Sequence, residues 1–510
     1  MDHARAALAL HPLVLGAPAP ASLVPEFSPA QAPQLDASGH LVDGAVLPAS
    51  GREVVESIDP ATGHRIGSVV AATPDEVDRA VASARRAFAG WRATAPGERA
   101  AALRRAAAAV REAREQLATL HTLDTGRLHA QALGCVDAAV SLISEAAEHG
   151  PLDSGRALGG SLGAVDLVRR EPRGVVAAIT PWNDPLPAAA GVIAAALVTG
   201  NTVVHKPSER SPLVGRAFAA ILAAAVPEGV LNVIDGGART GADLVAHPDV
   251  DVVAHVGSSA AGEQIASSAG PRGAKLLLEN GGSDVMIVDE GVDPVWAAQQ
   301  CALGAFVNTG QLCVAVERVL VHERVALRFL DALAEQAAEW ATGDPLDAAT
   351  KLGPMVDERM LAHVEDQVNA AVRAGALVRA GGYREARPGS WFPATVLEDC
   401  GPGMAVWDEE TFGPVAPVRV VSSFDEALDL AGRTDYGLAA TVLTPQVSRA
   451  LAAVDALDVG TVKVNNVFGG APGGSADPRR RSGTGRGYGP DLINELTVVK
   501  TVHLGQCVTQ

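Results

Sequence analysis

The sequence has few aromatic residues, few lysines and few cysteines. Aromatic side chains make up 4% of its 510 residues, and lysine occurs only five times. Each lysine position is therefore informative, and the lysines are Lys206, Lys275, Lys351, Lys463 and Lys500. The five cysteines are widely spaced and form no Cys-x-x-Cys pair. This pattern disfavours a disulfide framework and a metal site, and it favours a reducing compartment.

Long apolar runs and clustered positive charge are also missing. No run is long and apolar enough to span a bilayer. The apolar stretch 6–15 is interrupted by His11 and Pro12 and lacks the charged start of a secretory signal. The net charge is -18, with scattered basic residues, which disfavours nucleic acid and anionic membranes as partners. The sequence therefore predicts a cytoplasmic protein.

The chain is long enough to bury more than one hydrophobic core. Its 48% apolar content predicts two or three domains. Residues 1–50 are rich in alanine and proline without clear periodicity, which predicts a poorly ordered extension. Ordered structure is expected to begin near Val54, with a hairpin through residues 58–63. Thr73 and Glu76 then form a capping box that begins a helix.

Five short apolar runs follow, separated by helical stretches. They are residues 175–179, 202–205, 231–234, 252–256 and 275–278. Each run is too short for a helix and too uniformly apolar for a strand with one solvated face. Parallel strands that are buried on both faces have this pattern. The sequence therefore predicts an α/β fold with a doubly wound parallel sheet, whose ligand binds at the carboxyl ends of the strands.

The loops at these carboxyl ends carry unusual polar residues. Residues 180–186 follow the first run, and the glycines of 257–262 open a helix where a pyrophosphate could bind. Lys206 and Glu209 follow the second run, three residues apart, and can together hold ribose hydroxyls. Because Glu209 would repel a 2′-phosphate, the sequence predicts NAD rather than NADP as the cofactor.

A second α/β unit is expected beyond Gly281. A helix over 294–307 leads into a loop that ends at Cys313, and a cysteine in such a loop can be an exposed nucleophile. Glu279 ends an apolar run, where desolvation raises the pKa of a carboxylate and suits it to take a proton. For either residue taken alone, a structural role is the alternative interpretation.

Eight motifs in a fixed order provide the context for these residues. They are PWN (181–183), KPSE (206–209), PEGVLNV (227–233), GS (257–258), LENGG (278–282), NTGQLC (308–313), EETFGPV (409–415) and SGTGR (482–486). Over residues 54–503 the chain resembles the aldehyde dehydrogenase superfamily. The resemblance implies an NAD-binding domain (51–149 and 171–280), a catalytic domain (281–470) and a small β oligomerisation element (150–170 and 486–510). It also implies a homodimer or homotetramer.

The resemblance assigns roles residue by residue. Cys313 matches the nucleophile, Glu279 the general base and Asn183 the amide of the oxyanion hole. The residues that match cofactor contacts are Thr180, Trp182, Lys206, Ser208, Glu209, Gly257, Ser258, Glu410 and Phe412. These matches imply NAD-dependent oxidation of an aldehyde to a carboxylic acid, through a thiohemiacetal and a thioester on Cys313.

Two alternatives to this reaction are a CoA-acylating aldehyde dehydrogenase and a catalytically silent scaffold. The acylating type transfers the thioester to a thiol and generally lacks the base that Glu279 matches. The presence of both Cys313 and Asn183 argues against a silent scaffold.

The sequence departs from the family pattern around the substrate. Asp184 stands where phenylalanine is usual, Gly191 lies where large residues are frequent, and residues 475–478 replace a PFGG motif. The predicted substrate-pocket residues are Asp184, Gly191, Leu312, Val314 and Ala476. One interpretation is a wide pocket for a bulky aldehyde, with an amino group near Asp184. The other is sequence drift, with different side chains filling the space.

Overall fold

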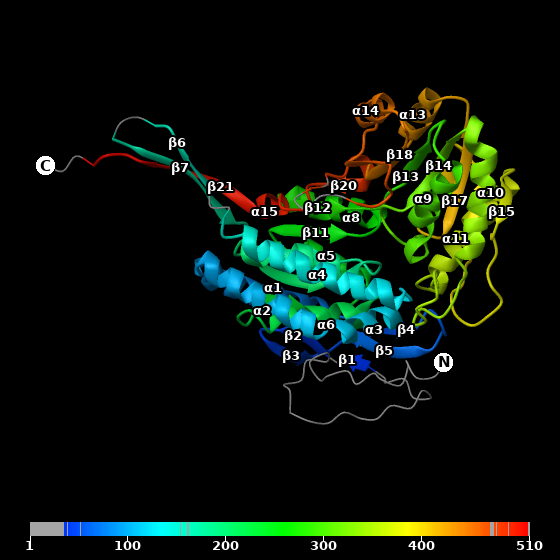
Figure 1. Ribbon diagram of the computed structural model, residues 1–510. Coiled ribbons are helices and arrows are strands. Elements are labelled where there is room, and N and C mark those ends of the chain that lie inside the picture. The colour runs from blue at the N-terminus through cyan, green and yellow to red at the C-terminus, as the bar shows by residue number, and fades with distance from the viewer. Residues whose placement is uncertain are drawn as a thin grey trace.

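The computed structural model of the protein describes most of the chain. The described residues are 35–37, 39–51, 53–152, 155–160, 163–469, 474–475, 477–487 and 489–507. Ala476 and much of the predicted N-terminal extension lie outside these ranges. Figure 1 shows two large sheets flanked by helices, and a thin arm of strands that projects from the first of them.

The first large sheet has eight strands in the order β20-β12-β11-β8-β9-β10-β2-β3. Its central strands are parallel: β8 (Val175–Ile179), β9 (Thr202–Lys206), β10 (Leu231–Val233), β11 (Val252–Val256) and β12 (Lys275–Glu279). The outer strands pair antiparallel with their neighbours: β2 (Gly39–Val42) between β10 and β3, and β3 (Ala45–Pro48) and β20 (Gly483–Thr484) at the two edges. The chain runs outward from β8 in both directions, which confirms the predicted doubly wound sheet.

Both faces of the central strands are buried, as their uniformly apolar sequences predict. In β8, Val175 and Ala177 belong to one hydrophobic cluster, while Val176 and Ala178 belong to another. This alternation follows from the pleat of a strand, in which successive side chains point to opposite faces.

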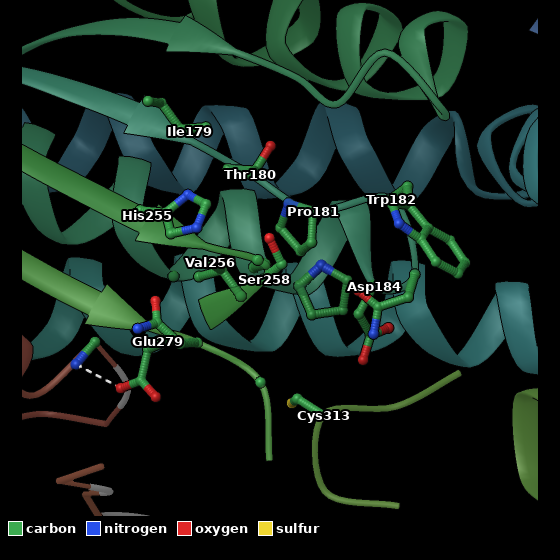
Figure 2. Close-up of a pocket in the computed structure, with 18 of the residues that line it drawn as sticks. Ile179, Thr180, Pro181, Trp182, Asp184, His255, Val256, Ser258, Glu279 and Cys313 are labelled. Carbon is green, nitrogen blue, oxygen red and sulfur yellow. Dashed lines mark hydrogen bonds between the residues drawn. The ribbon is translucent and has the colours of Figure 1, made fainter. Parts of the chain in front are cut away.

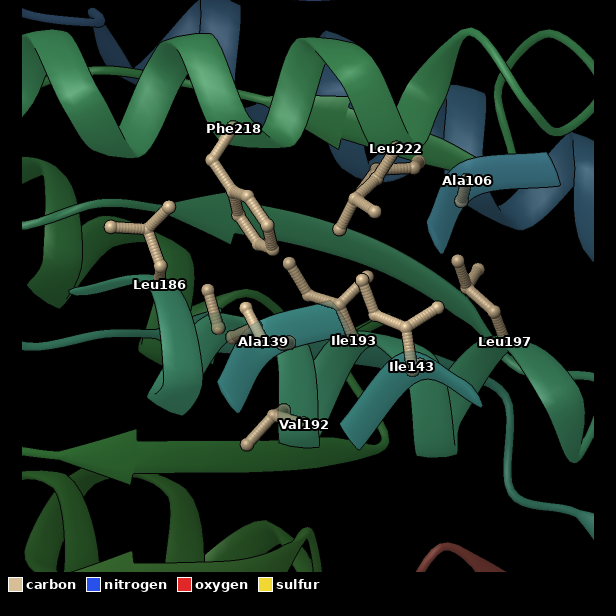
Figure 3. Packing of buried hydrophobic residues seen from close by; sticks show 14 of the residues in the cluster. Ala106, Ala139, Ile143, Leu186, Val192, Ile193, Leu197, Phe218 and Leu222 are labelled. Atoms are coloured by element: carbon tan, nitrogen blue, oxygen red, sulfur yellow. The ribbon is translucent and has the colours of Figure 1, made fainter. Parts of the chain in front are cut away.

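Helices cover both faces of this sheet. One face holds α1 (Pro74–Ala93), α7 (Ala238–Ala246) and α8 (Ser259–Ala269). The other holds α2 (Pro96–Glu112), α3 (Arg114–Thr125), α4 (His129–His149), α5 (Pro185–Val198) and α6 (Pro212–Ala223). In Figure 3, Ile143 of α4, Ile193 of α5 and Phe218 of α6 meet in one apolar cluster. Burial of this apolar surface is the main contribution to the stability of the sheet.

The structure begins earlier in the chain than the sequence suggests. Strands β2 and β3 form a hairpin, and β2 joins the sheet through the pairing of Leu41 with Val233 of β10. His40 is buried, with its ring nitrogens 3.6 Å from Glu76 and 3.7 Å from Asp235. The prediction of a poorly ordered extension is therefore wrong for residues 39–48. These strands are too short for periodicity to reveal them, and contacts with distant residues hold them.

The second large sheet has seven strands in the order β15-β16-β17-β14-β13-β18-β19. They are β13 (Asp284–Val288), β14 (Val316–His322), β15 (Leu377–Ala380), β16 (Thr395–Glu398), β17 (Val415–Val421), β18 (Ala439–Leu443) and β19 (Thr461–Val464). Only β15 pairs antiparallel to its neighbour among these described strands. The helices around it are α9 (Pro294–Phe306), α10 (Glu323–Glu339), α11 (Glu358–Arg373), α12 (Ala405–Asp408), α13 (Phe424–Gly432) and α14 (Val447–Ala456).

Two small sheets complete the described structure. One has the order β1-β5-β4, and its β4 (Val54–Ile58) and β5 (Arg65–Val70) form the predicted hairpin, with β1 (Leu35–Ala37) beside β5. The other forms the arm in Figure 1, where β7 (Val165–Pro172) lies between β6 (Gly155–Leu158) and β21 (Thr497–Leu504). A short helix, α15 (Leu492–Glu495), precedes β21.

None of the helices in the described ranges combines the length and the apolar composition that a bilayer span requires.

Glu76 connects the N-terminal segment to α1. The backbone N–H and the hydroxyl of Thr73 donate to Glu76 Oε2 at 2.8 and 2.9 Å, as the predicted capping box requires. The backbone N–H and the hydroxyl of Ser50 donate to Glu76 Oε1 at 2.6 and 3.0 Å. Burial opposes the charge, but these hydrogen bonds outweigh it and lower the pKa of Glu76 from 4.5 to about 2.

We expect Glu76→Gln to lower the free energy of unfolding by about 2–3 kcal/mol at neutral pH, since one pKa unit corresponds to about 1.4 kcal/mol. Because the folded-state pKa is lowered, this contribution is present above the unfolded pKa of 4.5 and is lost as the pH falls towards about 2. Urea unfolding from neutral to acid pH should show a difference that shrinks with acidity. Exposed Glu98 of α2 provides the control: Glu98→Gln should change stability by less than about 0.5 kcal/mol.

Candidate active site

A cavity of about 1160 Å³ opens at the carboxyl ends of the central strands and reaches the second large sheet. It lies where the loops after β8 and β11 diverge, which is the position that a doubly wound sheet offers to ligands. Every predicted site residue that the structure describes lines this cavity. Figure 2 shows Glu279, Cys313 and Asp184 around one space. Thr180 begins the loop after β8, and its hydroxyl lies 2.9 Å from His205 Nε2.

Cys313 follows a strained reversal of the chain. After α9, the residues Asn308 and Thr309 have left-handed backbones, with φ of 51° and 59°. Gly310 has φ of 69°, and a Cβ there would lie 2.0 Å from the carbonyl oxygen of Gly413. Only glycine fits this position. Left-handed backbones outside glycine cost about 1–3 kcal/mol each and persist where the surroundings enforce them, which is typical of functional sites.

Gln311 holds this reversal and connects it to Asn183. Its side-chain oxygen accepts from Val356 N at 2.9 Å, and its side-chain nitrogen donates to Asn308 O at 3.1 Å. Its backbone carbonyl accepts from Asn183 Nδ2 at 3.0 Å and from Asn308 Nδ2 at 3.1 Å. An amide nitrogen has two hydrogens, so Asn183 keeps one for another acceptor. The Asn183 amide is therefore bound to Gln311, which precedes Cys313 by two residues in the chain.

Glu279 lies at the end of β12, facing the cavity. Its Oε1 accepts from Gly487 N at 3.0 Å, the bond drawn as a dashed line in Figure 2. Burial, with a smaller contribution from the charge of Asp477, raises the pKa of Glu279 to about 8. A carboxylate with this pKa can exchange a proton near neutral pH. A Cβ at Gly487 would lie 2.5 Å from Glu279 Cγ, so this conformation of Glu279 requires glycine there.

The surroundings of Cys313 disfavour its thiolate. Burial raises the pKa of the thiol above its usual range, and the charges of Asp284, Glu279, Asp184 and Glu410 raise it further. Because the thiolate is the nucleophilic form, the site needs a base or a cation to populate it.

Lys206 ends β9 with its ammonium group buried. Nζ donates to the carbonyl oxygens of Pro207 and Gly236 at 2.8 Å each, and it lies 3.6 Å from Glu209. Two of its three N–H bonds are thus used, which leaves one for Glu209 or for a ligand between them. The Ser208 hydroxyl accepts from Arg210 N at 3.2 Å. Lys206 and Glu209 together suit a vicinal diol, such as the hydroxyls of a ribose.

Gly257 and Ser258 connect β11 to α8. A Cβ at Gly257 would lie 2.7 Å from the ring of His255, so a larger residue does not fit. The Ser258 hydroxyl accepts from Ala261 N at 3.3 Å and caps the helix. Gly257, Ser258 and Ala261 all line the cavity, which places the amino end of α8 at the cavity wall. Free N–H groups and the positive end of the helix dipole suit a pyrophosphate there, so these residues fit a dinucleotide.

Glu410 and Phe412 approach the cavity from the second large sheet. Glu410 Oε1 accepts from Gly282 N at 3.0 Å, and burial raises the pKa of Glu410 to about 8. Phe412 has φ of 53°, and its backbone N–H donates to buried Glu317 Oε1 at 3.0 Å. Its ring meets Trp182 edge to face, with centroids 5.5 Å apart. This contact joins the loop after β8 to the second sheet.

Asp184 is paired within the protein. Arg127 Nη1 donates to Asp184 Oδ1 at 2.9 Å and to the backbone oxygen of Asn183 at 2.7 Å. The thiol of Cys135 donates to the same Asp184 oxygen at 3.3 Å. Arg127 thus neutralises Asp184 and also fixes the backbone that carries the Asn183 amide.

Small residues of α5 border the cavity beyond Asp184. Ala188, Gly191 and Ala195 line it, with Leu142 and Ala146 of α4. A Cβ added at Gly191 would meet no atom within 4 Å, so the space beside it is open. Leu312 and Val314 flank Cys313 in the lining.

Three residues that shape the site were absent from the sequence-based prediction. Arg127 pairs with Asp184, Glu317 holds the Phe412 backbone and Gly487 holds Glu279. Gly487 directly follows the SGTGR motif, so its position was a usable signal. Arg127 and Glu317 lie in no motif, and only the fold brings Arg127 to the cavity wall and Glu317 to the backbone of Phe412.

Comparisons with known proteins agree with the motif series. Residues 46–502 match the aldehyde dehydrogenase family. The chain is 36% identical over 456 residues to the benzaldehyde dehydrogenase [NAD(+)] of Pseudomonas putida, covering 87% of this chain and 92% of that protein. It is 35% identical over 464 residues to aminoaldehyde dehydrogenase 1 of Pisum sativum, covering 88% and 92%. A solved structure of 3,6-anhydro-L-galactose dehydrogenase in complex with NAP is similar with a TM-score of 0.89 and 33% identity, covering 92% of this chain and 99% of that one.

We expect Gly310→Ala to destabilise the protein by several kcal/mol, since its Cβ would lie 2.0 Å from a carbonyl oxygen and its φ of 69° is strained for alanine. The midpoint of urea unfolding measures this loss. Gly191→Ala is the matched control: its Cβ enters open space within a helix, so stability should rise by up to about 1 kcal/mol. An unchanged midpoint for Gly310→Ala would show that the reversal before Cys313 relaxes without penalty.

Proposed function

The chain belongs to the aldehyde dehydrogenase family and oxidises an aldehyde with NAD or NADP, and we propose that Cys313, Asn183 and Glu279 carry out its chemistry. The observation that supports these roles is the convergence of the three side chains on one cavity. The hydrogen bond from Asn183 to the carbonyl of Gln311 fixes the amide beside the cysteine loop.

The proposed reaction begins with attack of Cys313 Sγ on the carbonyl carbon of the aldehyde. The oxygen becomes an oxyanion, and the free N–H of Asn183 with the backbone N–H of Cys313 stabilises it. A nicotinamide cofactor held by Lys206, Glu209 and Ser258 would supply the acceptor for the hydride that the aldehyde carbon loses. That carbon remains on Cys313 as a thioester. Glu279 takes a proton from water, and the resulting hydroxide attacks the thioester and releases the carboxylic acid.

The pKa of about 8 for Glu279 suits this last step. A carboxyl group that is only partly ionised near neutrality binds a proton more strongly than an ordinary glutamate. The hydrogen bond from Gly487 holds its carboxylate at the cavity wall. A base in this place supports hydrolysis of the thioester over transfer to coenzyme A, and the complete set of groups supports an active enzyme over a silent scaffold.

NAD rather than NADP is the cofactor that we propose. Glu209 stands 3.6 Å from the Lys206 ammonium at the rim of the cavity. Its carboxylate can accept from a ribose hydroxyl but would repel a 2′-phosphate. The relatives include both an NAD and an NADP enzyme, so this preference depends on Glu209 rather than on the family.

A bulky aldehyde is the substrate class that we propose. The open space beside Gly191 supports a wide entrance. The pairing of Asp184 with Arg127 removes the free negative charge that an amino group would need, so size is better supported than a positive charge. Relatives that act on benzaldehyde and on aminoaldehydes show that both kinds of substrate occur in similar chains.

The division of the chain and its assembly are further parts of the proposal. The ranges 51–149 with 171–280 contain most of the first large sheet and form the cofactor domain, while 281–470 contains the second and forms the catalytic domain. The arm of β6, β7 and β21 is the proposed contact for a homodimer or homotetramer, because β21 is an edge strand with exposed Val499. Five unpaired cysteines support a cytoplasmic location.

The purified protein should reduce NAD with at least one bulky aldehyde, measured as absorbance of the reduced nicotinamide. Cys313→Ala should abolish turnover, and Asn183→Ala should slow it roughly a hundredfold, because one oxyanion donor contributes about 3 kcal/mol. Cys507→Ser is the matched cysteine control and should keep full activity, since Cys507 is exposed and outside the cavity. An active Cys313→Ala would refute the assigned nucleophile, and equal rates with NADP would refute the cofactor preference.

Gly191→Leu should raise KM for bulky aldehydes by roughly tenfold or more and leave short aliphatic aldehydes within about twofold, because the new side chain fills space that only a large substrate uses. Steady-state kinetics over an aldehyde series provide the measurement. Gly134 of α4 also has nothing within 4 Å of an added Cβ, but it is exposed outside the cavity, so Gly134→Leu is the control. Equal loss for short and bulky aldehydes would mean that Gly191 does not select by size.

A further inference from the structure

Lys463 differs from the other four lysines of the chain. Those four each form an ion pair: Lys206 with Glu209, Lys275 with Glu495, Lys351 with Glu339 and Lys500 with Glu171. Lys463 has no carboxylate oxygen within 4 Å among the described residues. Its Nζ lies 5.8 Å from the centroid of the Phe468 ring, and both side chains line the cavity that contains Cys313.

The second large sheet places Lys463 near the reaction centre. Lys463 of β19 is in register with Thr441 of β18, which is in register with Met286 of β13. Asp284 begins β13, and its Oδ1 accepts from Ala439 N at 2.9 Å. Asp284 on β13, Lys463 on β19 and the cysteine loop that precedes β14 thus belong to the consecutive strands β14-β13-β18-β19, and Lys463 and Cys313 line the cavity.

Asp284 lies next to the backbone of Cys313. A Cβ built on Gly282 would be 2.6 Å from the carbonyl oxygen of Cys313 and 3.1 Å from Asp284 Oδ1. The other carboxyl oxygen of Asp284 is buried and has no hydrogen-bond partner among the residues that the structure describes. An unpartnered buried carboxyl oxygen is costly and interacts strongly with any nearby charge.

Charged groups on several elements face the Cys313 sulfur. The carboxyl groups are Asp184 after β8, Glu279 on β12, Asp284 on β13 and Glu410 after α12. In their ionised forms all four disfavour a negative charge on the sulfur, and Arg127 already pairs with Asp184. Lys463 interacts favourably with the charged forms of both Asp284 and Cys313, while burial opposes its own charge. An interaction of this kind is reciprocal, so the ammonium favours the thiolate as much as the thiolate favours the ammonium.

We propose that the ammonium group of Lys463 is the electrostatic partner of the Cys313 thiolate, and that Asp284 competes with the thiolate for that ammonium. The proposal rests on the role of Cys313 as the nucleophile. Lys463 acts through Cys313 and is therefore a positioning residue. Lys463 favours the thiolate before the reaction, whereas Glu279 acts on water after the thiolate has reacted.

The test is the pH dependence of Cys313 alkylation by iodoacetamide, a neutral probe of the thiolate. Cys507→Ser serves as the background, since Cys507 is exposed while Cys135, Cys301 and Cys400 are buried. The rate is measured on the peptide that contains Cys313, without aldehyde or cofactor. Lys463→Met should move the midpoint upward by about one pH unit and slow alkylation about tenfold near neutral pH. Lys463→Arg keeps the charge and should stay within a few tenths of a unit of the background.

Asp284→Asn should move the midpoint in the opposite direction, because it removes a negative charge and frees the ammonium while keeping the oxygen that accepts from Ala439. Lys351→Met removes an exposed lysine outside the cavity and should leave the midpoint unchanged. An unchanged midpoint in both Lys463→Met and Asp284→Asn overturns the proposal. If Lys463→Met does not fold, Lys463→Gln takes its place, because Asp284→Asn removes a negative charge near the sulfur whether or not Lys463 contributes.

The alkylation test also separates this inference from the proposed function. The expected shifts in a protein without aldehyde turnover would uphold the lysine–cysteine pair and reject only the assigned reaction. Normal turnover that requires Cys313, with no shift in any variant, would reject only the role of Lys463.

Discussion

The hydrogen bond from Asn183 to the carbonyl of Gln311 connects the two large sheets at the reaction centre. Asn183 follows the central strand of the first sheet, and Gln311 precedes Cys313 at the entrance to the second. Because the amide is bound to the loop of the nucleophile, its position relative to the sulfur depends on one bond rather than on the packing of the two sheets. Arg127 reinforces it from the other side by binding the Asn183 backbone. The left-handed backbones of Asn308 and Thr309, just before Gly310, are strained in this arrangement.

Burial determines the chemistry of the groups around this connection. It raises the pKa of both Glu279 and Glu410 to about 8, so these carboxyl groups are largely protonated near neutrality. Their neutral forms reduce the negative charge around Cys313, where a thiolate has to form. The same desolvation disfavours that thiolate, which makes an unpaired ammonium such as Lys463 valuable at this place. Desolvation thus makes Glu279 a stronger base for hydrolysis. It also disfavours the Cys313 thiolate, so a cation is needed nearby.

Asp184 and Gly191, two positions where the sequence departs from the family pattern, each fit their surroundings. Asp184 brings a negative charge to the cavity wall, and Arg127 neutralises it with a hydrogen bond of 2.9 Å. Gly191 opens space on the next turns of α5 without disturbing the buried face of the helix. Gly487 has no side chain and so leaves room for Glu279. Asp184 is therefore paired, while the space beside Gly191 stays open.

The sequence by itself determined the central strands, the helix start at Thr73 and part of the set of residues that line the cavity. These features are recorded locally: apolar runs specify strands buried on both faces, a capping box specifies a helix end, and short motifs occupy the strand–loop junctions. Only the tertiary structure decided that β2 joins β10, that Arg127 neutralises Asp184 and that Lys463 has no carboxylate within ion-pair distance in the described part of the chain. Each of these facts depends on the distance between residues far apart in the chain. The periodicity and spacing of residues in the sequence do not predict such distances, because the packing of the whole fold determines them.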